Sequence, residues 1–248
     1  MSTGVQPSDD GERQGTAPAH WRSSADWPAG TYLSLLPDHA HRALWSVGVR
    51  KDYEPHEVLV REGDPSTFLA VILDGLTKVT SMTAEGHVSL LAFRAAGDLV
   101  GELGVLDRAP RAATVEAVTA VRARLVPHDT FVNQVRAEPA LALALVSAVS
   151  EKLRAATRAR VDTGGYPLAV RVARTISELA GSYGRTDGEG TVIDFPLSQE
   201  DLAAIVSSSA VGVARVLRQF RERGMVRTRY RRLMVTDWDA LSELAAAD

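Results

Sequence analysis

Short apolar segments alternate with turn residues between Tyr53 and Val126, and this pattern limits the possible folds more than any other feature of the chain. Sequences such as Glu62-Gly63-Asp64 and Asp74-Gly75 separate the apolar segments. Many short β-segments at regular spacing are typical of a small sandwich or barrel. The pattern therefore predicts a small β-unit in the first half of the chain.

A long helical stretch follows, from Pro139 to about Asp162. Proline is favourable at the first position of a helix. Residues along this stretch repeat at steps of four and three, as in the seam of a coiled coil: Ala142, Val146, Val149, Leu153, Ala156 and Arg160. The seam favours a partner helix, although packing on the helix's own domain would give a similar pattern. The segment Thr163-Gly164-Gly165-Tyr166-Pro167 is expected to break the helix and form a hinge.

The C-terminal part has the pattern of a helix-turn-helix. An amphipathic helix is expected from Leu168 to about Ala180, then a polar loop from Gly181 to Gly190 and two closely spaced helices. Ser198 suits the N-cap of the first of these two helices, and Asp201 gives an approximate capping box. Ser207-Ser208-Ser209 supplies the turn, with Ser209 as the cap of the second helix.

The formal net charge of −3 hides a strongly basic patch near the C-terminus. Eight arginines lie close together there: Arg215, Arg218, Arg221, Arg223, Arg227, Arg229, Arg231 and Arg232. The second helix would enter the major groove with its N-terminal end first, and the arginines of the following hairpin would meet phosphates. The alternative is a winged-helix-like domain that packs on another protein and leaves its arginines in solvent. The basic patch argues against this alternative.

Several classes of protein are excluded by composition. The chain has no cysteine, which excludes disulfides and thiolate metal sites. Its six histidines are scattered, and it has no phosphate loop or nucleophile elbow, so we expect neither a metal site nor an enzyme. No apolar run approaches the roughly 20 residues of a membrane span. Residues 1–20 lack the apolar core of a secretory signal, so we expect a cytoplasmic protein.

The stretch from Val100 to Val115 carries the most specific signal. It offers one carboxylate, Glu102, and one guanidinium, Arg111, separated by a short turn. The planar fork of an arginine suits a phosphate, and an ionised carboxylate accepts hydrogen bonds from a ribose. Small residues flank both side chains and leave room for a ligand: Gly101, Ala112 and Ala113. The stretch therefore predicts a pocket for a sugar phosphate.

This stretch resembles the phosphate-binding cassette of the cyclic-nucleotide-binding domain family, without a gap from Gly101-Glu102-Leu103 to Pro110-Arg111-Ala112-Ala113-Thr114. From about Thr31 to Trp238 the chain resembles the cyclic AMP receptor and FNR (Crp/Fnr) family of transcription regulators. The resemblance implies an α+β fold with a jelly-roll-like β-roll, a long dimerisation helix and a C-terminal winged helix-turn-helix. The expected boundaries are a disordered tail at 1–28, the β-roll at 29–136, the dimerisation helix at 137–163, the DNA-binding domain at 164–240 and a C-terminal tail at 241–248.

The resemblance also implies roles in ligand binding. Glu102 would bind the ribose 2′-hydroxyl and pair with Lys152, and Arg111 would bind the cyclic phosphate. The two family positions that contact adenine hold Ala156, which has no hydroxyl, and Thr157, which does. A small residue after Arg111 favours cAMP over cGMP. The expected ligand-binding residues are Gly101, Glu102, Leu103, Arg111, Ala112, Ala113, Leu91, Lys152 and Thr157.

The function implied is that of a ligand-responsive regulator that binds palindromic double-stranded DNA as a homodimer, with RNA polymerase as a further partner. The expected DNA-binding residues are Ser198, Ser208, Ser209, Ala210, Val211, Arg215 and Arg218. The family usually has glycine at the turn and an Arg-Glu pair opening the recognition helix. Here Ser207, Ala210 and Val211 hold those positions, so we expect a DNA site unlike the usual consensus. The alternative is a regulator with a degenerate pocket, either a constitutive DNA binder or a module that binds a protein partner.

Overall fold

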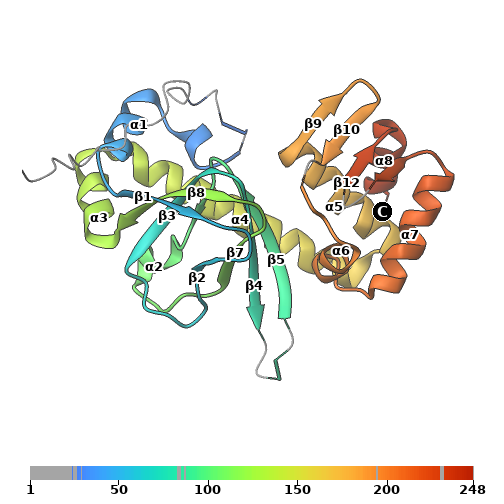
Figure 1. Ribbon diagram of the computed structural model, residues 1–248, viewed down its shortest axis with the longest axis horizontal. Coiled ribbons are helices and arrows are strands. Elements are labelled where there is room, and N and C mark those ends of the chain that lie inside the picture. The colour runs from blue at the N-terminus through green and yellow to red at the C-terminus, as the bar shows by residue number, and fades with distance from the viewer. Residues whose placement is uncertain are drawn as a thin grey trace, which may run out of the picture.

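The computed structural model describes residues 24, 27–28, 30–82, 85–86, 88–193, 195–229 and 232–247. Its first half is a β-roll, its middle a long helix, and its last third a small helical domain with a four-stranded sheet (Figure 1). The predicted α+β fold is confirmed. Most of the expected N-terminal tail, including Trp21, lies outside the described residues.

Two four-stranded antiparallel sheets form the β-roll, with strand orders β1-β8-β3-β6 and β2-β7-β4-β5. The strands are β1 Val49–Tyr53, β2 Val58–Val60, β3 Phe68–Asp74, β4 Leu76–Met82, β5 Val88–Ala95, β6 Leu99–Val100, β7 Thr114–Ala117 and β8 Val121–Pro127. Side chains alternate along β3, so Ala70 and Ile72 pack inside the roll while Leu69 and Val71 pack under the outer helices. Burial of both faces explains why β3 is apolar almost throughout.

The outer layer consists of the 3-10 helix η2 (Leu33–Leu35), α1 (Asp38–Trp45), α3 (His128–Ala137) and the first turns of α4 (Ala140–Gly165). Trp27 also packs here and is only 5% exposed, with its ring centroid 6.4 Å from that of Trp45. Trp27, which falls within the tail expected at residues 1–28, is therefore packed on the domain.

Helix α4 has 26 residues and buries only its N-terminal half against the β-roll. The buried positions are Leu141, Ala144, Leu145 and Ala148, the spacing of one helix face. The helix continues through Gly164 and Gly165, where the sequence predicted a break. It ends at Gly165. The next residue, Tyr166, has an extended backbone, because Pro167 disfavours helical backbone in the residue before it.

The C-terminal domain comprises α5 Leu168–Tyr183, β9 Gly184–Asp187, β10 Gly190–Ile193, α6 Gln199–Ile205, α7 Ala210–Glu222, β11 Val226–Arg229, β12 Arg232–Val235 and α8 Trp238–Ala245. The predicted loop at 181–190 is instead the end of α5 and most of a β-hairpin. Residues 241–245, predicted as a tail, belong to α8, because Leu241 is fully buried in the domain core. No helix in the described part of the chain is long and apolar enough to cross a membrane.

Candidate nucleotide cavity and recognition helix

A small cavity of about 110 Å³ lies in the β-roll beside α2 (Leu103–Asp107) and the middle of α4. Among the residues predicted to bind a ligand, those that line it are Gly101, Glu102, Leu103, Arg111, Ala112, Ala113 and Lys152. Apolar side chains from β2, β4 and β7 complete the walls, together with Arg94 of β5. The fold thus gathers most of the predicted ligand residues around one cavity, and their binding roles remain predictions.

Leu91 and Thr157 were predicted in the same set but do not line the cavity. The strand register shifts between β4 and β5, where Val79 pairs with Ala92 and Thr80 with Leu90, so Leu91 is an extra residue in β5. Such a bulge disrupts the alternation of side chains. Leu91 is accordingly 56% exposed, and Thr157 is exposed on α4 with its hydroxyl bonded to a backbone carbonyl.

Glu102 is held in place by Lys152. The Lys152 Nζ lies 2.9 Å from the Glu102 carboxylate and also donates to the Leu99 carbonyl at 2.7 Å. Burial lowers the pKa of Lys152, while the negative charge of Glu102 raises it. Because Lys152 belongs to α4, this ion pair ties the long helix directly to the wall of the cavity.

Arg111 is almost completely buried, and its guanidinium is fixed by the backbone. One terminal nitrogen donates to the Gly101 carbonyl at 2.9 Å, the other donates to the Phe68 carbonyl, and the group lies over the Phe68 ring. Burial lowers the pKa of Arg111, and the charges of Glu102 and Asp64 raise it. Gly101 has a φ of 78°, and a Cβ there would lie 2.3 Å from the guanidinium, so only glycine fits this approach.

Two charged residues near the cavity were not predicted from the sequence. Arg94 lines the cavity wall, and Asp98 lies close enough to interact electrostatically with Arg94, Lys152 and Glu102. Burial raises the pKa of Asp98, and the two cations lower it. Nothing in the local sequence marks Arg94, because its direction depends on the register shift at Leu91.

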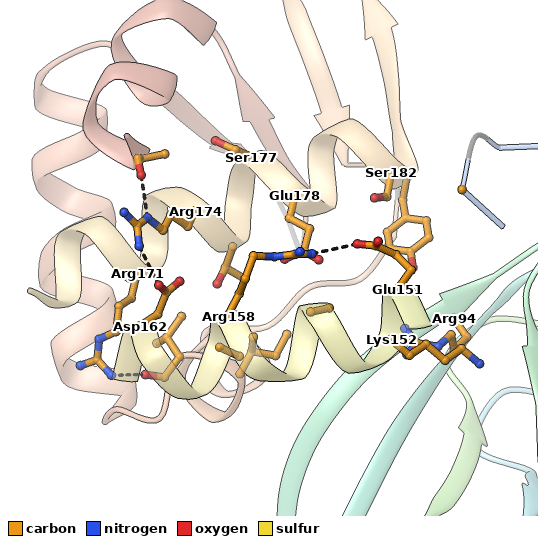
Figure 2. A pocket seen from close by; sticks show the side chains of 18 of the residues that line it. Arg94, Glu151, Lys152, Arg158, Asp162, Arg171, Arg174, Ser177, Glu178 and Ser182 are labelled. Atoms are coloured by element: carbon orange, nitrogen blue, oxygen red, sulfur yellow. Dashed lines mark hydrogen bonds and ion pairs between the residues drawn. The ribbon is translucent and has the colours of Figure 1, made fainter. Parts of the chain in front are cut away.

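A second, larger cavity of about 640 Å³ separates α4 from α5, and Arg94 and Lys152 line both cavities. Figure 2 shows its charged walls. Arg158 pairs with Glu151 at 3.0 Å, and Arg174 pairs with Asp162 at 2.6 Å. This cavity lies between the β-roll's helix and the C-terminal domain, so its shape depends on how the two parts are arranged.

The predicted helix-turn-helix is formed by α6 and α7. Ser198 and Asp201 make a complete capping box at the start of α6, and the Ser209 hydroxyl caps α7 by accepting from the Gly212 amide at 3.1 Å. Ser207 occupies the turn with a φ of 51°. Ser198 is thus engaged in a cap within the domain.

The outer face of α7 carries Val211, which is 71% exposed, one helical turn before Arg215 and two before Arg218. The opposite face is buried in the domain core and comprises Val213, Val216, Leu217 and Phe220. Ser208 and Ala210 are partly buried beside the turn. Figure 1 places α7 on the side of the domain away from the β-roll, so its outer face is open to a large partner.

Two family models match the chain. The model of the cyclic nucleotide-binding domain matches residues 50–138, and that of the Crp-like helix-turn-helix domain matches residues 170–244. The chain belongs to the Crp/Fnr family. This Crp/Fnr protein is therefore a transcription regulator with a cyclic-nucleotide-binding domain, as the sequence predicted.

Known proteins resemble this Crp/Fnr regulator over most of its length. The CRP-like cAMP-activated global transcriptional regulator of Mycobacterium tuberculosis is 26% identical over 217 residues, which cover 88% of this chain and 96% of that protein. The cAMP-activated global transcriptional regulator Vfr of Pseudomonas aeruginosa is 24% identical, covering 84% and 95%. The structure of FixK2 from Bradyrhizobium japonicum has the same fold, with a TM-score of 0.73, 20% identity and coverage of 82% and 99%.

No group of histidine, aspartate and glutamate within the described residues could hold a metal ion.

Proposed function

We propose that this regulator binds a cyclic nucleotide, cAMP in preference to cGMP, and binds palindromic DNA as a homodimer. The observation that carries the ligand proposal is that Glu102 and Arg111, both buried side chains, line the same cavity. Asp98 and Glu102 balance the charges of Arg94 and Lys152, with which they interact. The planar guanidinium of Arg111, on which Glu102 and Asp64 also act, would bind the cyclic phosphodiester.

The preference for cAMP rests on Ala112 and on the relatives. A methyl group follows Arg111 where a hydroxyl would favour cGMP, and two regulators similar to this chain are named as cAMP-activated. Thr157 lies one turn after Leu153 on α4, away from the cavity of its own chain. We propose that in a dimer through this face Thr157 would contact a base bound in the partner's cavity.

The homodimer proposal rests on apolar residues that α4 leaves exposed. Leu143, Val146 and Leu153 are between 58% and 71% exposed. They lie on one side of the helix, at steps of three and seven residues. Several exposed leucine and valine side chains along one helix favour burial against a partner helix.

The DNA proposal rests on the exposed face of α7. Arg215 is suited to a guanine edge, and the exposed methyl groups of Val211 are suited to a thymine methyl. We therefore expect each half-site to depart from the consensus of relatives that carry an Arg-Glu pair here. RNA polymerase is the further partner that this role implies.

One observation favours the alternative, a regulator with a degenerate pocket. Both terminal nitrogens of Arg111, which would bind the phosphate, already donate to the Gly101 and Phe68 carbonyls. Two parallel bonds to a phosphate would compete with these carbonyls and favour movement of the Arg111 side chain. Constitutive DNA binding or binding of a protein partner would need no such movement.

Calorimetric titration with cAMP and with cGMP tests the proposal directly, with Arg111→Lys as the matched variant. Lysine keeps the charge but lacks the planar fork that binds a phosphate through two parallel bonds. We expect cAMP to bind the natural protein more tightly than cGMP and Arg111→Lys to lose at least tenfold in affinity, about 1.4 kcal/mol. A circular dichroism melt must accompany each variant, because loss of the Arg111 bonds to two buried carbonyls also costs stability. Absence of binding to both nucleotides would support the degenerate pocket.

A further inference from the structure

The β-roll and the DNA-binding domain share one apolar core. Leu76, Leu90 and Phe93 of the β-roll belong to the same buried cluster as Phe195 and Leu202 of the DNA-binding domain. The Phe93 and Phe195 rings lie 5.1 Å apart, and Figure 1 shows α6 beside β5. The arrangement of the two parts therefore depends on contacts with β5.

A polar contact borders this core at the Phe93 carbonyl. The carbonyl accepts a hydrogen bond from Arg94 Nη1 at 2.7 Å and another from the Tyr183 hydroxyl at 3.2 Å. Arg94 and Tyr183 therefore share this carbonyl as acceptor. The Tyr183 ring packs edge-on against Phe195 at 6.2 Å. Tyr183 is the last residue of α5, so this contact joins the end of that helix to the β-roll.

Arg94 extends this contact to the nucleotide cavity. Its side chain lines both the small cavity and the larger cavity between α4 and α5. It also interacts electrostatically with Asp98 and Lys152, and Lys152 holds Glu102. Arg94 thus lies between the cavity that Glu102 lines and the Phe93 carbonyl that Tyr183 binds.

We infer that Arg94 and Tyr183 are positioning residues that couple occupancy of the nucleotide cavity to docking of the DNA-binding domain on β5. The inference rests on the proposed function, since it assigns the residues through which the same ligand acts. We call this arrangement closed: Arg111 donates to the Gly101 and Phe68 carbonyls and Arg94 donates to the Phe93 carbonyl, so the phosphate of a bound nucleotide competes with these bonds. The phosphate of an entering nucleotide attracts the Arg94 guanidinium, and movement of Arg94 disturbs the Phe93 carbonyl that both Arg94 and Tyr183 bind.

The sign of the coupling follows from linkage. The bond between Tyr183 and the Phe93 carbonyl stabilises the closed arrangement. Because the nucleotide binds better to the open arrangement, a bond that stabilises the closed one lowers nucleotide affinity. Tyr183→Phe removes the hydroxyl and leaves the ring that packs on Phe195. Tyr183 does not line the nucleotide cavity, so any effect of this change on nucleotide affinity must act through the closed arrangement.

The test compares the full-length natural protein with Tyr183→Phe, Arg94→Gln, the double variant, and Arg158→Gln as a control. Arg158 lines the larger cavity but pairs with Glu151 on its own helix. Tyr183→Phe loses one hydrogen bond, so we expect its affinity for cAMP to rise by about 2- to 10-fold. We expect the effect of cAMP on its DNA affinity to fall by a similar factor. In the Arg94→Gln background the same change is expected to have a smaller effect, because one of the two groups that bind the Phe93 carbonyl is already absent. Arg158→Gln is expected to behave as the natural protein.

Amide hydrogen exchange, measured without nucleotide, separates this inference from the proposed function. Tyr183→Phe and Arg94→Gln are expected to speed exchange in β5 and at the end of α5 to the same extent, and Arg158→Gln is not. Unchanged exchange in both variants would overturn the inference, whatever nucleotide binds. Faster exchange in a protein that binds neither cAMP nor cGMP would support the docking contact and reject only the proposed ligand. Binding of cAMP with identical affinity in the natural protein and in Tyr183→Phe would reject the coupling and leave the proposed function intact.

Discussion

Ser207 adopts a left-handed backbone conformation in the turn between α6 and α7. This conformation places Cβ close to the following carbonyl oxygen and costs a non-glycine residue roughly 1–2 kcal/mol. The Ser207→Gly change removes that cost but adds backbone freedom to the unfolded chain, worth roughly 0.5–1 kcal/mol. We expect Ser207→Gly to stabilise the domain by up to about 1 kcal/mol in urea denaturation. Ser208→Gly is the control, because only the entropic cost applies there, and equal losses in both variants would refute the argument.

Asp98 gives the protein a pH dependence of defined sign. Burial raises the pKa of Asp98 above 3.8, its value in the unfolded chain. Folding therefore favours the protonated form, and the stability gained from this proton is fully present below pH 3.8 and is lost as pH rises through the pKa of the folded state. An Asp98→Asn variant does not titrate, and its amide oxygen still accepts from the Ala95 amide.

We expect the unfolding free energy of Asp98→Asn, relative to that of the natural protein, to increase as pH rises from 4 to 7. Urea denaturation at a series of pH values measures this difference. Asp74→Asn removes an exposed carboxylate from the same half of the chain and serves as the control. A difference that stays constant across this pH range would contradict the assignment.

Helix α4 changes its surroundings along its length. Its first turns are buried against the β-roll, whereas Leu153 lies beyond them and is 67% exposed. The proposed dimer would bury Leu153 against helix α4 of the partner. In a twofold dimer, a glutamate at this position would lie close to the same glutamate of the partner and repel it. Loss of one buried leucine costs at least about 1.5 kcal/mol, or roughly tenfold in the dissociation constant of the dimer.

We expect Leu153→Glu to convert the dimer to a folded monomer in sedimentation equilibrium. Leu106→Glu changes a leucine of similar exposure on α2 and is expected to leave the dimer unchanged. A Leu153→Glu protein that keeps the mass of the natural protein would show that α4 does not form the interface.

The whole molecule determines how the two recognition helices of a dimer would meet DNA. In a twofold dimer the α7 helices would read half-sites about 34 Å apart, one turn of the duplex. Insertion of about five base pairs between the half-sites turns one of them to the opposite face of the DNA. We expect this insertion to lower affinity to that of a single half-site, measured by fluorescence anisotropy at fixed salt. Equal affinity for both spacings would be inconsistent with a rigid homodimer.

Local sequence patterns determined the β-roll, the long helix and the helix-turn-helix. Turn residues between short apolar segments, the repeat of fours and threes in α4 and the Ser198–Asp201 capping box each depend on neighbours within a few residues. Glu102 and Arg111 were predicted to meet because a gapless motif fixes their separation along the chain. The pairing of Glu102 with Lys152 followed only from the family resemblance, since 50 residues separate the two side chains.

Only the tertiary structure decided the features that depend on packing between distant segments. The register shift between β4 and β5 excludes Leu91 from the cavity wall that Arg94 joins. No local pattern marks that shift, because it depends on how two strands pair. Burial of Trp27 and of Leu241 brought both expected tails partly into the fold, because each side chain fills a place in a core formed by residues far away in sequence. The contact of Tyr183 with the Phe93 carbonyl, 90 residues away, likewise exists only once the β-roll and the DNA-binding domain have packed together.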